Sequence, residues 1–404
     1  MKARLSLMMF LEFFIWGGWF VTMGSYLGTT LGASGAQIAQ AYSTQSWGAI
    51  IAPFIFGLIA DRYFRAERVL AAIHLAGGAL MLGLARQASF AGFFPLMLIY
   101  MILYMPTLAL VNAVAFRQLR DPAREFSMIR VWGTIGWILA GLFISYLFAW
   151  DAPLAVAQGM LRNTFNMCGV ASILMGLYSL SLPPTPPVRR SGPQAIGDLL
   201  GVDALKLLAN RNFLVFFLSS VLICIPLAFY YQDANQFLTE LRLPNPTGKQ
   251  TLGQMSEVAF MLLMPVFLQR VGMKTTLLVG MLAWAVRYVL FAYGNAGELV
   301  FLLLVGIALH GVCYDFFFVS GQIYIDSKAG PQIKGAAQGL ITLATYGAGM
   351  LIGFWAAGRI TDHYALAGVH EWRAIWKLPA LSAALVFIFF ALTFRNESVQ
   401  YVKA

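Results

Sequence analysis

The sequence has few charged residues for its length. Asp, Glu, Lys and Arg make up only 11% of the 404 residues, whereas about 25% is usual in soluble domains. Hydrophobic residues make up 60% of the chain and the mean hydropathy is +0.73, so most of the chain cannot face water. Apolar runs of about 18 to 25 residues recur throughout, and each could cross a bilayer as a helix. The composition therefore predicts an all-α membrane protein.

Cysteine is also scarce, and the motifs of common enzyme classes are missing. The three cysteines, Cys168, Cys224 and Cys313, lie in apolar runs without the spacing of metal ligands, so we interpret them as packing residues. The sequence contains no nucleophile elbow and no phosphate-binding glycine loop. An enzyme is therefore not expected, and no metal or other cofactor is predicted.

Acidic residues are fewer than basic ones, 17 against 27, which gives a formal net charge of +10. The placement of the basic residues explains this excess better than nucleic-acid binding does. If the N-terminus is cytoplasmic, most of them fall in inner loops, including Lys2, Arg4, Arg62, Arg65, Arg68, Arg117, Arg120, Arg124, Arg189, Arg190, Arg270, Lys274, Lys328, Lys334, Arg395 and Lys403. Such an asymmetry is typical of cytoplasmic loops, and it predicts that both termini are cytoplasmic.

The apolar runs predict twelve transmembrane helices in two sets of six. The first set lies near residues 5–30, 37–60, 67–86, 90–116, 126–149 and 163–183, and the second near 212–237, 251–269, 275–294, 299–323, 335–358 and 374–394. Prolines and charges at 183–190 indicate a loop between the sets. We therefore predict an N-terminal six-helix bundle at 1–185 and a C-terminal one at 212–404. The cytoplasmic linker at 186–211 would contain either a short amphipathic helix or a simple tether.

One short motif follows the second predicted span. The segment from Gly57 to Arg65 reads GLIADRYFR, and it resembles the signature loop of the major facilitator superfamily. In that loop glycine permits close helix approach, and the aspartate and basic residues form a charged latch at the cytoplasmic helix ends. Here the latch would comprise Gly57, Asp61, Arg62 and Arg65. A weaker counterpart, QRVGMK at 269–274, is expected in a duplicated transporter fold.

Further motifs narrow this resemblance to one family. They are WGGW at 16–19, YMPTL at 104–108, IRVWGTIG at 129–136, QMSE at 254–257, YDFF at 314–317 and AQG at 337–339. In this order they look like the bacterial nucleoside:proton symporter family, and they cover nearly the whole chain. The resemblance implies proton-coupled nucleoside uptake by alternating access, in the bacterial inner membrane, by a protein that works as a monomer.

Ionisable residues inside the predicted spans are the first candidates for function. An ionisable side chain in hydrocarbon is costly, so it normally faces a cavity, a partner or a transport pathway. The residues concerned are Glu12, His74, Arg130, Asp233, Glu257, Arg287, His310 and Asp315. We interpret His74 and Arg287 as structural residues, and Glu12 either as lining the cavity or as making a local helix contact.

Helical spacing groups several of these residues with polar or aromatic neighbours. Arg130, Thr134 and Trp137 lie at i, i+4 and i+7, so one helix face offers a cation, a hydroxyl and an aromatic ring. Two further pairs share faces in the same way, Gln254 with Glu257 and His310 with Tyr314. A flat, hydroxylated ligand needs such hydrogen-bonding groups and stacking rings.

The family resemblance agrees with this set only in part. Arg130, Thr134, Gln254 and Glu257 match positions that bind the nucleoside in better-known members. Other positions differ. Where better-known members have Phe, this chain has Trp137, and where they have Tyr and Phe, it has His310 and Tyr314. Ala228 and Tyr231 replace a Gln and an Asn. We include Tyr231 among the expected substrate-binding residues. Since direct hydrogen bonds decide which near analogues are rejected, these changes leave the precise substrate open.

Two carboxylates are candidates for proton coupling. Burial favours the neutral form of a carboxyl group, which makes Asp315 and Glu257 suited to take up and release a proton. An alternative for Asp315 is an ion pair that packs helices together. For the whole protein, the alternative to nucleoside uptake is coupled or uncoupled transport of another small polar solute, such as a sugar.

Overall fold

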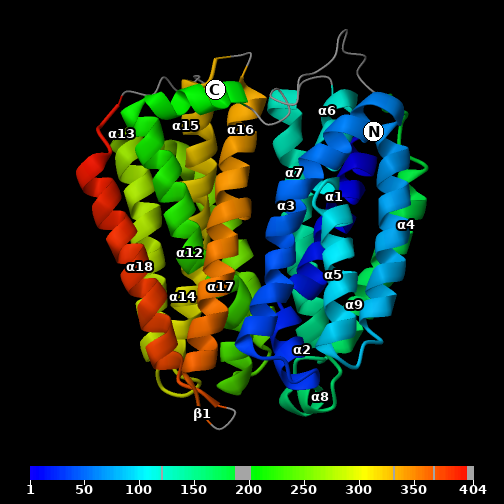
Figure 1. Cartoon of the computed structure of the whole chain (residues 1–404), viewed down its shortest axis with the longest axis vertical. Helices are drawn as coiled ribbons and strands as arrows, with labels where there is room; N and C mark the ends of the chain where they lie inside the picture. The colour runs from blue at the N-terminus through cyan, green and yellow to red at the C-terminus, as the bar shows by residue number, and fades with distance from the viewer. Residues whose placement is uncertain (120–121, 187–201, 331–332, 367–368, 398–404) are drawn as a thin grey trace. The chain divides into compact units, whose positions relative to one another are not determined.

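The computed structural model describes residues 1–119, 122–186, 202–330, 333–366 and 369–397, apart from the side chains of 52–63, 122–124 and 202–203. Regular structure in these ranges is helical except for one short hairpin (Figure 1). Its strands, β1 (Ala365–Leu366) and β2 (Val369–His370), pair antiparallel. The predicted all-α architecture is therefore confirmed.

The chain divides into two compact units. The first comprises Met1–Gly192 and Tyr231–Thr251, and the second comprises Pro193–Tyr230 and Leu252–Ala404. The first division falls within the linker predicted at 186–211. Residues 231–251, which come from later in the chain, belong with the first unit. The domain limits at 185 and 212 stay a prediction.

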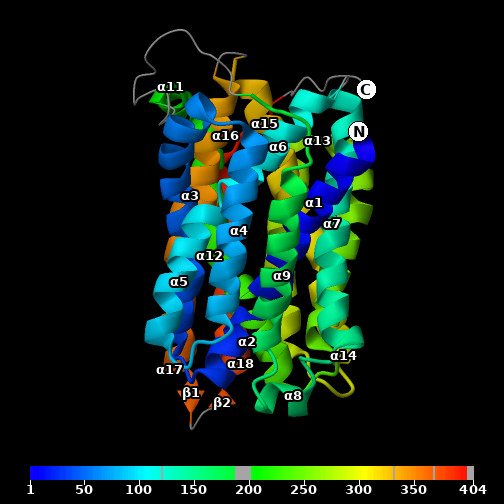
Figure 2. The same cartoon turned by 90° about the vertical axis from the view of Figure 1, so that its right-hand side faces the viewer.

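The first unit contains the N-terminal helices. They are α1 (Lys2–Phe20), α2 (Met23–Thr30), α3 (Gly35–Tyr63), α4 (Ala66–Leu84), α5 (Phe90–Tyr104), α6 (Thr107–Gln118), α7 (Pro122–Leu142), the π-helix η1 (Phe143–Leu147), α8 (Pro153–Ala157) and α9 (Arg162–Ser179). Figure 2 shows α4, α9, α1 and α7 as neighbours in that order, and α4 packs on α9, α9 on α1 and α1 on α7.

Glycines bring α1 and α7 into backbone contact. A Cβ atom added at Gly136 of α7 would lie 2.2 Å from the carbonyl oxygen of Phe10, and one added at Gly17 of α1 would lie 2.7 Å from Trp137. Only residues without a side chain permit so close an approach between two helices. The glycines of the WGGW and IRVWGTIG motifs therefore have a packing role.

The remaining helices follow the predicted linker. They are α11 (Val202–Leu205), the 3₁₀-helix η2 (Lys206–Ala209), α12 (Arg211–Glu240), α13 (Pro246–Tyr293), α14 (Val300–Tyr314), the π-helix η3 (Asp315–Val319), α15 (Ser320–Lys328), α16 (Lys334–Thr342), the π-helix η4 (Leu343–Gly349), α17 (Met350–His363) and α18 (Trp372–Thr393). The short helices α11 and η2 lie within the linker segment, whose residues 187–201 are outside the described part of the chain.

Helix α13 is broken at one glycine. Forty-eight helical residues would span about 72 Å if straight, but Gly272 has φ 77° and ψ 173°, a conformation that is essentially restricted to glycine. The break lies in the QRVGMK segment, where the sequence predicts a loop between two spans.

The described residues contain nine helical stretches that are long and apolar enough to cross a membrane. Eight of them each correspond to one predicted span, for example Arg211–Glu240 to 212–237 and Trp372–Thr393 to 374–394, and Pro246–Tyr293 covers the two predicted at 251–269 and 275–294. The spans predicted at 37–60 and 163–183 are not among the nine, so the number twelve stays a prediction. Large apolar side chains are exposed on these stretches, such as Leu262 at 77% and Leu392 at 79%. Such side chains are stable in contact with lipid. The chain is therefore a multi-pass membrane protein.

Candidate functional site

In the first unit, α7 directs a cation and an aromatic ring toward α1. The guanidinium carbon Cζ of Arg130 lies 4.0 Å from the ring centroid of Phe13, which is within the range of a cation–π interaction. Nearly two turns along α7, the ring of Trp137 meets that of Trp16 edge to face, with centroids 5.7 Å apart. Arg130, Thr134 and Trp137 are each half-buried. Arg130 and Trp137, which the sequence predicts to share a face, thus both contact α1.

The aromatic contacts continue one turn further along α1. The ring of Phe20 lies 6.4 Å from that of Trp137 and 5.5 Å from that of Tyr231, between centroids. Phe13, Trp16 and Phe20 follow one another at helical spacing, and we call them the α1 aromatic row. This row connects three of the candidate residues in the first unit, namely Arg130, Trp137 and Tyr231.

In the second unit, Asp315 carries a buried carboxyl group. The residue is 0% exposed, and neither of its carboxyl oxygens accepts or donates a hydrogen bond within the described residues. It is the first residue of η3, and π-helical turns in α-helices are common at functional sites. Glu257 lies within electrostatic range. An isolated buried carboxylate is unfavourable, so this group is suited to carrying a proton.

A buried arginine contacts His310, which lies five residues before Asp315. Arg287 of α13 is 0% exposed, its Nη1 lies 3.1 Å from His310 Nδ1, and its Cζ lies 3.3 Å from the ring centroid of Tyr230. Because arginine only donates hydrogen bonds, His310 Nδ1 accepts and the ring carries its proton on Nε2. The ring of His310 also stacks on that of Tyr230, at 5.3 Å between centroids. The predicted structural role of Arg287 thus includes fixing a candidate binding residue.

Helices α13 and α14 approach closely where these candidates lie. A Cβ atom added at Gly311 would lie 2.5 Å from the backbone nitrogen of Glu257, and one added at Gly253 would lie 3.0 Å from His310 Cβ. The backbone N–H of Gly311 donates a hydrogen bond to Ser256 Oγ over 3.1 Å. The glycines thus bring the QMSE segment of α13 next to His310.

The other predicted binding residues lie on α13 and α14. Gln254 and Glu257 are half-buried, and the ring of Tyr314 lies 5.9 Å from that of His310. In the latch, Gly57 and the side chains of Asp61 and Arg62 fall in the stretch whose side chains are not described, whereas Arg65 is exposed and precedes α4. The roles assigned to all these residues stay predictions. Within the described ranges, no group of three or more His, Cys, Asp or Glu residues could hold a metal ion.

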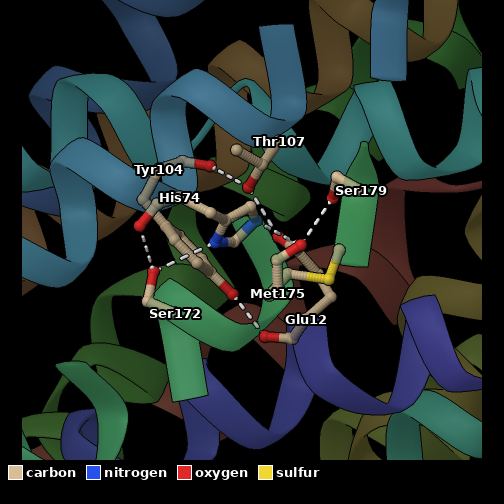
Figure 3. Close-up of polar contacts among 7 residues, drawn as sticks. All are labelled: Glu12, His74, Tyr104, Thr107, Ser172, Met175 and Ser179. Carbon is tan, nitrogen blue, oxygen red and sulfur yellow. Dashed lines mark hydrogen bonds and ion pairs between the residues drawn. The ribbon is translucent and has the colours of Figure 1, made fainter. Parts of the chain in front are cut away.

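Sequence reasoning missed one polar cluster in the core of the first unit. Glu12 and His74 form a buried pair with Nε2 and Oε2 2.9 Å apart, surrounded by Tyr104, Thr107 and Ser172 (Figure 3). Of the two expectations for Glu12, the structure shows a helix contact, which is made with His74 of α4. Two ionisable residues in separate apolar spans were the available signal, but nothing in the sequence paired them.

Comparison with known proteins identifies the family. The family model for the nucleoside H+ symporter matches residues 1–399. The chain belongs to this family. The symporter is 43% identical to "Putative nucleoside transporter YegT" of Escherichia coli strain K12, over 98% of this chain and 94% of that protein. It is 34% identical to the xanthosine permease of the same strain, over 99% of this chain and 97% of that protein.

A solved structure agrees with this assignment. The symporter superposes on a crystal structure of a mutant of the nucleoside transporter NupG with a TM-score of 0.90. The two sequences are 29% identical, and the match covers 98% of this chain and 100% of that chain. The resemblance that the sequence motifs indicate, from WGGW to AQG, is thus confirmed at the level of the family and its fold.

Proposed function

We propose that the symporter couples uptake of nucleosides across the bacterial inner membrane to the movement of protons, by alternating access. The observation that carries the proton part is the buried carboxyl group of Asp315, which has no hydrogen-bond partner in the described part of the chain. A carboxyl group in this environment is stable when neutral and costly when ionised. Glu257, within electrostatic range, is the second candidate.

The substrate part rests on the family and on the residues grouped above. In the first unit, the guanidinium of Arg130 and the hydroxyl of Thr134 would bind polar groups, and Trp137 and Tyr231 would contact the base or sugar. In the second unit, Gln254, Glu257, His310 and Tyr314 would do the same. Flat rings with hydroxyl groups fit such a mixture of donors, acceptors and aromatic faces.

The membrane topology is part of the same proposal. With the break at Gly272, α13 would make two passes, while α3 and α9, with 29 and 18 residues, are each about 27 Å long or longer. Together with eight further apolar stretches, they would make twelve spans in two six-helix halves. The basic inner loops support cytoplasmic termini, and the protein would act as a monomer in the bilayer.

The changed binding positions keep a second cargo open. Trp137, His310 and Tyr314 stand where better-known members have other aromatic residues, and a site's hydrogen bonds determine which analogues it rejects. Another small polar solute such as a sugar, with or without proton coupling, is therefore the alternative.

Uptake into proteoliposomes tests both parts. Labelled nucleosides and sugars are supplied with and without an inward proton gradient. If one proton moves with each nucleoside, a gradient of one pH unit supports roughly tenfold accumulation. The reason is that a tenfold ratio of proton concentrations and a tenfold ratio of nucleoside concentrations across the membrane correspond to the same free energy. Saturable uptake of a sugar, without uptake of any nucleoside, would contradict the proposal that nucleosides are the substrate.

Asp315→Asn tests the coupling, and Glu298→Gln is its control because Glu298 is exposed. The Asp315 variant should exchange nucleoside across the membrane but accumulate none, whereas the Glu298 variant should accumulate it as the wild type does. Full accumulation by Asp315→Asn, and also by Glu257→Gln, would remove both carboxylates as proton carriers.

A further inference from the structure

A polar network surrounds Glu12 and His74 inside the first unit. Glu12, Thr107 and Ser172 are 0% exposed and His74 is 1% exposed. His74 Nε2 lies 2.9 Å from Glu12 Oε2, and His74 Nδ1 lies 3.1 Å from Ser172 Oγ. The network joins α1, α4, α6 and α9, as Figure 3 shows. Buried polar groups of this kind are stable only when their donors and acceptors match.

Counting protons fixes the state of the histidine. The hydroxyl of Ser172 has one proton, and it donates that proton to the carbonyl oxygen of His74 over 2.9 Å, because a carbonyl can only accept. The contact between Ser172 Oγ and His74 Nδ1 must therefore use a proton on Nδ1. A neutral ring protonated on Nδ1 has a lone pair on Nε2.

The contact between the two ionisable residues then needs a proton of its own. An ionised Glu12 has only acceptors, so without a further proton two acceptors would face each other across 2.9 Å. One proton, on His74 Nε2 or on Glu12 Oε2, turns this contact into a hydrogen bond. The pair is uncharged overall when the proton is bound and negative when it is absent.

We propose that Glu12 and His74 form a proton-binding site in the first unit, separate from Asp315, and that the bound proton holds α1 against α4. This inference rests on the proposed function for its role in coupling, but the site itself is independent of the cargo. A shared proton is the ligand, and Thr107 and Ser172 complete its surroundings.

The hydroxyl of Thr107 can partly compensate for loss of the shared proton. Thr107 Oγ1 lies 2.5 Å from both Glu12 Oε1 and the carbonyl oxygen of Tyr104. Because the hydroxyl has one proton, it can bond only one of them fully at a time. When Glu12 is ionised, this hydroxyl turns to the carboxylate and partly replaces the lost donor.

Among the described residues, the other ionisable side chains that interact with Glu12 are ordinarily neutral near pH 7. The phenols of Tyr100 and Tyr104 and the thiol of Cys168 interact electrostatically with Glu12 or with one another, and such groups are ordinarily neutral in this pH range. Within the described residues, His74 is the only ion-pair partner of Glu12. The proton balance of the site is therefore set by these two residues.

The position of Glu12 links proton binding to the candidate substrate face. Glu12 directly precedes Phe13, on which Arg130 stacks. The hydroxyl of Tyr104 donates a hydrogen bond to the backbone oxygen of Glu12 over 2.7 Å, so the network holds the backbone of α1 as well as its side chain. Loss of the proton would loosen α1 where the α1 aromatic row begins.

Histidine NMR tests the site without substrate. The chain has only four histidines, so imidazole-¹⁵N-labelled protein in nanodiscs gives few signals, and His74→Gln identifies those of His74. We expect the His74 signals to change once as the pH is raised, when the proton shared with Glu12 leaves, and Nδ1 should be protonated before and after this transition. In Glu12→Gln, whose amide can still bond the ring, this transition should be absent.

Two further variants make the outcome decisive. His363→Gln, at an exposed position, should leave the His74 transition unchanged. Ser172→Ala removes the acceptor for Nδ1–H and should shift the transition. His74 signals that do not change with pH, or a transition that is the same in Glu12→Gln and Ser172→Ala as in the wild type, would overturn the proposal. Because no nucleoside is present, this result is distinguishable from failure of the proposed cargo.

Discussion

Gly133 of α7 offers a direct test of the contact between Arg130 and Phe13. A Cβ atom added there would lie 2.7 Å from Phe13 Cδ2 and 2.8 Å from Arg130 Nη1. Ordinary contacts of this kind are longer by about 0.6 Å or more, since carbon atoms pack best at 3.5–4.0 Å. The alanine variant must therefore displace the ring, the guanidinium or both.

The expected loss follows from the interaction that is displaced. A cation–π contact contributes about 0.5 to 2 kcal/mol, depending on how far it is desolvated, and Arg130 is half-buried. If Arg130 must keep its position to bind substrate, Gly133→Ala should weaken nucleoside binding by roughly 2- to 30-fold. Isothermal titration calorimetry on protein in nanodiscs measures this change, and thermal unfolding measures stability in parallel.

Gly83→Ala is the matched control for this prediction. Gly83 lies in α4 of the same unit, and a Cβ atom there would meet Leu96 Cδ1 at 3.6 Å, an ordinary contact. Each variant adds one methyl group to a helix and gains the helix propensity of alanine. Wild-type affinity in Gly133→Ala, or equal losses in the two variants, would refute a role of the Arg130–Phe13 contact in binding.

Three other perturbations address the second unit. Asp315→Asn replaces the buried carboxyl group, which has no hydrogen-bond partner among the described residues, by an uncharged amide of similar size. At alkaline pH, where an ionised carboxylate would be buried without a partner, this change should raise the free energy of unfolding by about 1–3 kcal/mol, and a lower melting temperature would contradict this prediction. Gly272→Ala should cost about 1–3 kcal/mol because its φ is 77°; Gly339→Ala, with nothing within 4 Å, should be neutral or stabilising in the same denaturation assay. Arg287→Lys loses the planar donor to His310 and should weaken nucleoside binding roughly tenfold, whereas unchanged affinity would mean that this hydrogen bond does not matter for binding.

The fold was predictable because hydrocarbon imposes a simple rule on sequence. A run of apolar residues as long as Arg211–Glu240 must form a helix, since its backbone groups find no other partners in lipid. Breaks were harder to predict: the sequence shows one run for residues 5–30, but the first helix ends at Phe20 and a new one begins at Met23. Local backbone geometry of this kind leaves little trace in hydropathy.

The candidate site was predictable where spacing along one helix is enough. Arg130 and Trp137 both contact α1, as their shared face suggests. Contacts between helices were not predictable, because Glu12 and His74 are 62 positions apart and Arg287 and His310 are 23 apart. A single sequence shows which ionisable residues lie in apolar spans, but it does not show which residue on another helix pairs with each of them.

The π-helical turns in the described part of the chain have a consequence for how related sequences vary in length. Both η3 and η4 interrupt an otherwise α-helical stretch, whereas η1 ends the helix that begins with α7, and a π turn contains one residue more than the α turn that it replaces. Deleting one residue within Asp315–Val319 would therefore restore a regular α-helix while the flanking segments keep their faces. Single-residue insertions and deletions within spans should collect at these turns during evolution, because elsewhere they would rotate half of a helix away from its partners.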